Sequence, residues 1–118
     1  MKEIKQIYNN DFGTSFYWRK ENSIATDKVQ LIFRETGFYF NMQELQQFKN
    51  CIEDSYQQNS CCEECELKNQ CHKFLLRTPC IQIDLAVSME ELYAIKDLIE
   101  GTLFKINLDA YLFGEGLN

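Results

Sequence analysis

Proline, glycine and histidine are scarce in this chain, whose 118 residues include one proline, five glycines and one histidine. Disordered and low-complexity chains are rich in proline and glycine and poor in aromatic residues, whereas 14% of this chain is aromatic and 45% is hydrophobic. A chain of this length buries roughly 65% of the surface that its unfolded form exposes. We therefore expect one folded domain over residues 1–118.

Basic residues are also few, since 12 lysines and arginines face 18 aspartates and glutamates, for a formal net charge of −6. A protein that binds nucleic acid or an anionic membrane presents a basic face to neutralise phosphates. The composition therefore predicts neither nucleic acid nor membrane as a partner. It leaves a protein partner or a homo-oligomer.

Long apolar runs are missing throughout. The chain starts Met1-Lys2-Glu3-Ile4, without the apolar stretch of an export signal, and no later segment approaches the roughly 20 apolar residues of a membrane span. We therefore expect a cytoplasmic protein with reduced cysteines. Clustered reduced cysteines indicate metal or redox chemistry more than structural disulfides.

Aromatic and β-branched residues separated by turn residues dominate the first forty positions, which is typical of an antiparallel meander. The expected strands lie at 4–8, 16–18, 29–33 and 38–40. The turn between the last two contains Gly37, which we expect to supply a positive φ.

Two later segments change to the period of an amphipathic helix. Their apolar stripes consist of Met42, Leu45, Phe48, Ile52 and Tyr56, and of Met89, Leu92, Ile95, Ile99 and Leu103. Asn41 with Glu44, and Ser88 with Glu91, form capping boxes that begin these helices. The first helix is predicted to end near Gln57. Gly101 disfavours continuation of the second, so residues 102–108 are left open between helix and edge strand.

The two helices match at an offset of 47 positions, and each follows a predicted hairpin. The second hairpin includes a strand over 80–87 with Ile81, Ile83, Leu85 and Val87 on one face. The predicted fold class is therefore α+β: a mainly antiparallel sheet, meander plus hairpins, with two helices on one face. A two-fold hairpin–helix repeat is one interpretation, with a Cys-rich connector over 58–73 between the two units.

Six residues of that region are candidate metal ligands: Cys61, Cys62, Cys65, Cys71, His72 and Cys80. Cys62 and Cys65 form a C-x-x-C pair, whose tight turn aims two sulfurs at one ion, and Cys71 is close enough to be the third ligand. The fourth stays open among Cys61, His72 and Cys80. Sequence neighbours seldom both face one ion, which favours Cys80. Zinc is the expected metal.

Two other chemistries are compatible with the same cysteines. The C-x2-C-x5-C spacing of Cys62, Cys65 and Cys71 resembles the first ligands of auxiliary iron–sulfur clusters in some radical enzymes, although Leu75 stands where the next ligand would follow. A thiol redox pair needs stabilised thiolates, whereas the glutamates around Cys65 are expected to raise thiol pKa values, an effect that Lys68, His72 and Lys73 partly offset. Cys51 lies beside the apolar stripe of the first helix, so we expect it to pack as a small hydrophobe.

No catalytic constellation accompanies this cluster. Any histidine-dependent mechanism would have to use His72, and the sequence identifies neither an orienting group nor an oxyanion site for a Cys–His pair. The sequence therefore predicts a small, non-enzymatic binding or interaction module with a zinc-binding structural loop. The alternative is a thiol-based redox or metal-responsive regulatory protein that uses Cys62 and Cys65.

Overall fold

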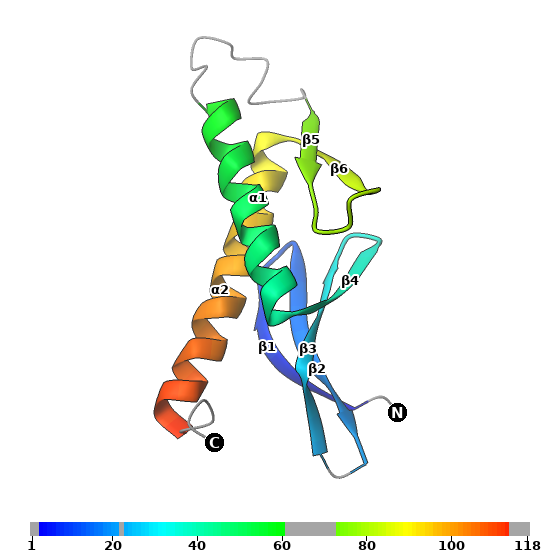
Figure 1. Ribbon diagram of the computed structural model, residues 1–118, viewed down its shortest axis with the longest axis vertical. Helices are drawn as coiled ribbons and strands as arrows, with labels where there is room; N and C mark the ends of the chain where they lie inside the picture. The colour runs from blue at the N-terminus through cyan, green and yellow to red at the C-terminus, as the bar shows by residue number, and fades with distance from the viewer. Residues whose placement is uncertain (1–2, 22, 61–72, 114–118) are drawn as a thin grey trace.

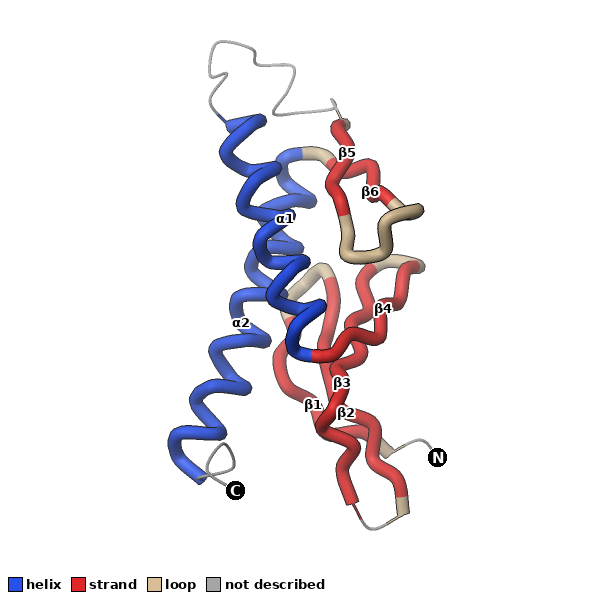
Figure 2. Tube along the Cα trace, viewed as in Figure 1, coloured by secondary structure: helices blue, strands red, loops and turns tan. Residues whose placement is uncertain are grey.

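The computed structural model describes residues 3–21, 23–60 and 73–113 and confirms the α+β class. The chain order of the elements is β1–β2–β3–β4–α1–β5–β6–α2 (Figure 1). Their bounds are β1 Ile4–Asn9, β2 Gly13–Lys20, β3 Ser23–Phe33, β4 Thr36–Asn41, α1 Met42–Ser60, β5 Phe74–Arg77, β6 Asp84–Val87 and α2 Met89–Phe113. Figure 2 shows that the strands and the helices form two separate layers. Neither helix is long and apolar enough to cross a membrane.

The first four strands form an antiparallel sheet in chain order, as the meander pattern predicted, and β5 pairs with β6 in a separate two-stranded sheet. Phe33 pairs with Thr36, so a two-residue turn joins β3 to β4. The positive φ in this turn belongs to Arg34, at 55°, and not to Gly37, which lies within β4. The expectation for Gly37 was therefore wrong, because the two turn residues are Arg34 and Glu35, and Gly37 already pairs with Ile32 of β3.

Both capping boxes are formed. The Asn41 N–H donates to Glu44 Oε1 (2.9 Å), and the Glu44 N–H donates to Asn41 Oδ1 (2.8 Å). Ser88 and Glu91 make the same reciprocal pair at 2.8 and 3.2 Å. Each box satisfies backbone donors that a helix start leaves without partners, so both helices begin where the sequence predicted.

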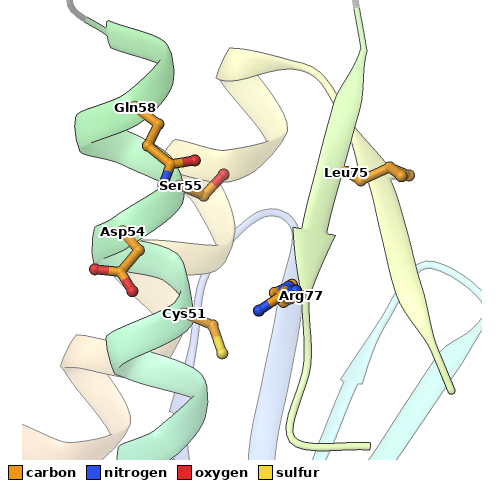
Figure 3. Close-up of a pocket in the computed structure, with 6 residues that line it drawn as sticks. All are labelled: Cys51, Asp54, Ser55, Gln58, Leu75 and Arg77. Atoms are coloured by element: carbon orange, nitrogen blue, oxygen red, sulfur yellow. The ribbon is translucent and has the colours of Figure 1, made fainter. Parts of the chain in front are cut away.

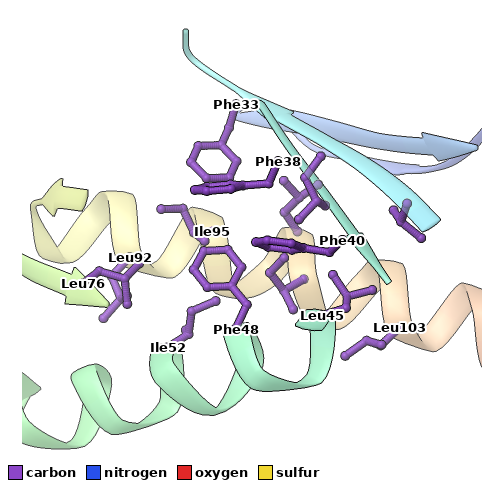
Figure 4. Close-up of a cluster of buried hydrophobic side chains, with 14 of the residues drawn as sticks. Phe33, Phe38, Phe40, Leu45, Phe48, Ile52, Leu76, Leu92, Ile95 and Leu103 are labelled. Carbon is purple, nitrogen blue, oxygen red and sulfur yellow. The ribbon is translucent and has the colours of Figure 1, made fainter. Parts of the chain in front are cut away.

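The core lies between the sheet and the two helices (Figure 4). Phe38 stacks on Phe40 with ring centroids 4.9 Å apart, and Phe48 of α1 packs against both rings at 5.7 and 5.8 Å. Ile95 of α2 is fully buried in the same cluster. The predicted helical stripes thus supply the buried faces of the helices, except that Met42 is 39% exposed and Tyr56 is half-buried.

The strand predicted over 80–87 is shorter than expected, because only Asp84–Val87 pairs with β5. Residues 78–83 form a loop in which Ile81 is 88% exposed and Ile83 is 44% exposed. The Thr78 hydroxyl accepts from the Cys80 N–H (3.1 Å) and donates to the Ile83 carbonyl (2.7 Å), which closes the loop locally. These side-chain bonds, next to a proline that has no N–H, replace the strand ladder.

Residues 102–108 are helical, so the edge-strand alternative is wrong. Gly101 does not end α2; it lets the Tyr8 ring lie directly on the helix, since a Cβ at this position would be 2.4 Å from two ring carbons. The next residue, Thr102, is fully buried, donates to the Leu98 carbonyl (2.6 Å) and lies 2.7 Å from the Ser15 hydroxyl. Contacts with β1 and β2 therefore hold this part of α2 in place.

The offset of 47 positions also relates side chains in the structure. Lys49 pairs with Glu53 at 2.7 Å on α1, and Lys96 pairs with Glu100 at 3.0 Å on α2. The buried residues Leu45, Phe48, Ile52 and Ser55 correspond in the same way to Leu92, Ile95, Ile99 and Thr102. The hairpins differ, since β3 and β4 belong to the larger sheet while β5 and β6 form their own. Duplication of one unit stays a prediction.

Candidate functional site

Most of the predicted metal ligands lie outside the described residues: Cys61, Cys62, Cys65, Cys71 and His72. Of the predicted set, Cys80 alone is described. It lies in the 78–83 loop, half-buried, with its Sγ 3.6 Å from Gln82 Oε1. Within residues 3–21, 23–60 and 73–113, no three His, Cys, Asp or Glu side chains come close enough to hold a metal ion.

The elements that flank the Cys-rich connector lie side by side. The first helix runs through Ser60, three residues beyond its predicted end, and β5 begins at Phe74. The Asn59 side chain donates to the Ser55 carbonyl at 2.8 Å on this added turn. Figure 1 shows the C-terminal end of α1 near the start of β5, so packed structure holds both ends of the connector.

Cys80 lies at the opposite end of the second hairpin from Phe74. The four residues of β5 span about 13 Å between these two ends. A site that includes Cys80 therefore needs the connector to extend along this hairpin, whereas one made by Cys61, Cys62, Cys65, Cys71 or His72 does not. Cys80 as the fourth ligand stays a prediction.

A pocket of about 450 Å³ opens between α1 and β5. Its lining consists of Cys51, Asp54, Ser55, Gln58, Leu75 and Arg77 (Figure 3). Cys51 and Arg77 point into the same space from the two elements. No local pattern in the sequence predicts this pocket, because its lining comes from two elements that are brought together only by tertiary packing.

The pocket does not activate its thiol. Burial, helped by the nearby Asp54 carboxylate, raises the pKa of Cys51, and Arg77 only partly offsets the increase. A raised pKa keeps the group as a neutral thiol at pH 7, which is a poor nucleophile and a poor metal ligand. Cys51 also packs against the hydrophobic core, so the prediction of a small hydrophobe is confirmed.

Glu91 connects three parts of the chain near the second hairpin. Besides capping α2, its carboxylate pairs with Lys73 at 3.0 Å and with Arg34 in the β3–β4 turn. The Glu91 side chain is 12% exposed, whereas those of Arg34 and Lys73 are 53% and 46% exposed. The sequence identified the cap but not the ion pairs, since those partners lie 57 and 18 positions away.

Replacing Glu91 by alanine should lower the free energy of unfolding by about 2 kcal/mol, because a cap is lost and two cations lose a partly buried partner. Glu91→Gln keeps the cap, so this variant should lower the free energy of unfolding less, by about 1 kcal/mol. Glu90→Ala, on the same turn but exposed, is the control and should stay within about 0.5 kcal/mol. Urea unfolding measures all three. Equal losses for Glu90 and Glu91 would contradict the role of these contacts.

Comparisons with known proteins give this chain no relatives: no family model, curated protein or solved structure matches it.

Proposed function

We propose that this chain is a non-enzymatic protein-interaction module in which the Cys-rich connector binds one zinc ion. The ion would order the connector at the end of the α1–β5 pair. The observation that carries the proposal is the density of ligands: four cysteines and the sole histidine lie within twelve residues, between two elements that pack side by side. Thiolate and imidazole groups are the ligands that zinc prefers in structural sites.

The packed ends of the connector support this proposal. Helix α1 and strand β5 contact each other, so the two elements on either side of the connector are already held together before any metal binds. Bringing ligands together costs less entropy when the flanking elements are held together than on a free chain. Less of the metal-binding free energy is therefore spent on ordering the connector than would be spent on ordering the same ligands at a chain end.

The proposed location and partners follow from the same chemistry. Zinc-binding thiolates have to remain reduced, which the cytoplasm ensures. The net charge of −6 favours a protein partner over nucleic acid. Cys51, the cysteine that lines the α1–β5 pocket, is disfavoured as a nucleophile by its raised pKa, so this pocket gives no support to thiol catalysis at Cys51.

Purified protein should contain one zinc ion per chain, as measured by elemental analysis. Cys62→Ser and Cys65→Ser should each abolish stoichiometric binding, because a three-ligand site holds zinc far more weakly. Cys51→Ser is the matched control and should keep the metal. Cys80→Ser decides the fourth ligand, since zinc will be lost only if Cys80 coordinates it.

Thiol titration separates this proposal from a redox pair. A bound metal should shield the connector thiols from alkylation until a chelator is added. Rapid alkylation of metal-free, stably folded protein, with Cys62 and Cys65 forming a reversible disulfide, would instead establish the redox alternative. Iron in place of zinc, with visible absorption, would establish a cluster.

A further inference from the structure

The C-terminal part of α2 carries large apolar side chains that are exposed in the described part of the chain. Phe104 is 63% exposed, Tyr111 is 84% exposed and Leu112 is 58% exposed, while Leu108 is half-buried. Figure 1 shows this part of the helix extending past the N-terminal end of α1. A helix segment with this much exposed apolar surface is typical of a contact with another chain.

These four residues form one stripe. Their spacing of i, i+4, i+7 and i+8 places them on a single helix face, which we call the α2 stripe. Leu103 and Ile106, which pack on the core, lie on the other side of the helix. The α2 stripe is therefore a second apolar face, additional to the face that holds the helix against the sheet.

The charges beside the stripe are self-complementary. Lys105 and Asp109 are the two charged residues between positions 102 and 113, and both lie on the same flank of the stripe. In an antiparallel helix pair each flank faces the same flank of the other helix. A two-fold axis near Leu108 then places each Lys105 beside Asp109 of the second copy, and Phe104 against Tyr111 and Leu112.

We propose that the α2 stripe is a homodimer interface in which two copies of this chain pair their α2 helices antiparallel. Residues 102–113 carry no net charge, because Lys105 balances Asp109. The repulsion between two copies, each with a net charge of −6, therefore does not arise from the surface where the helices meet. The two aromatic rings offer on the order of 300 Å² per copy. With the leucines and the polar flank, the interface falls at the small end of specific interfaces, so the dimer is reversible. This inference does not depend on the metal proposed for the connector.

Sedimentation equilibrium of the full-length chain tests the proposal. We expect a monomer–dimer equilibrium with a Kd of about 10–100 µM, unchanged by a chelator. Phe104→Glu with Leu112→Glu should weaken it at least about 100-fold, because each subunit would bury two carboxylates. Ile81→Glu, at an apolar site in the 78–83 loop that is even more exposed, is the control and should not change the Kd.

Charge reversal tests whether the partner that binds the α2 stripe is a second copy of this chain. Lys105→Glu or Asp109→Lys alone should weaken the dimer roughly tenfold, because each brings like charges together twice across the axis. The double reversal should restore the wild-type Kd. Circular dichroism and Tm monitor the fold of each variant. A chain that stays monomeric to about 1 mM, or a dimer insensitive to these changes, would overturn the proposal.

Discussion

Replacing Gly101 by alanine should lower the free energy of unfolding by about 2 kcal/mol, although the same change in an ordinary helix raises it by about 1 kcal/mol. The added methyl group would come 2.4 Å from the Tyr8 ring, far inside van der Waals contact. Equilibrium urea unfolding of the wild type and the variant measures the difference.

The Tyr8 ring cannot easily move away from this methyl group. Its hydroxyl donates to the Asp97 carboxylate at 3.0 Å, one helical turn before Gly101. That hydrogen bond, together with partial burial, raises the pKa of Tyr8. The Asn10 side chain holds the same carboxylate at 2.9 Å, so two residues around the β1–β2 turn fix the ring's position against α2.

A double-mutant cycle distinguishes this contact from a general intolerance of substitution. In a Tyr8→Ala background the obstacle is gone, and Gly101→Ala should stabilise the protein through helix propensity alone. The sign of the Gly101 effect therefore reverses between the two backgrounds. Stabilisation by Gly101→Ala in the wild type would show that Tyr8 does not pack on α2 as described.

Removing the metal proposed for the connector should lower the stability by about 3 kcal/mol, the amount expected when a ligand is present at a hundredfold excess over its Kd. The loss should appear as a lower Tm after chelation and recover when zinc is restored. Hydrogen exchange should increase most in the last turn of α1 and in β5, the elements that hold the connector.

Cysteine variants provide the controls for this experiment. Cys62→Ser should have the reduced Tm of chelated protein and should not respond to chelator. Cys51→Ser should keep the full response, since Cys51 packs against the core. A Tm that is the same with and without chelator, in protein shown to contain zinc, would contradict a stabilising role for the ion.

Local patterns in the sequence predicted the elements that depend on near neighbours. The capping boxes at Asn41 and Ser88 act over three residues, and the helical stripes repeat within two turns, so both could be recognised without a structure. The meander could be predicted in the same way, because short turns join consecutive strands. The strand predicted over 80–87 failed at residues 80–83, where the Thr78 side chain closes a loop, and the positive φ expected at Gly37 belongs to Arg34. The open choice at residues 102–108 was decided for helix by the packing of Tyr8 on Gly101.

Residue type and short-range spacing were enough to predict the α+β class, both helix starts and the ligand-rich character of the connector. They could not predict that α2 continues through Gly101, that Glu91 bridges the two hairpins or that the α2 stripe is exposed. Those features depend on residues that are far apart along the chain, because Tyr8 and Gly101, or Arg34 and Glu91, meet only after the sheet and helices have packed.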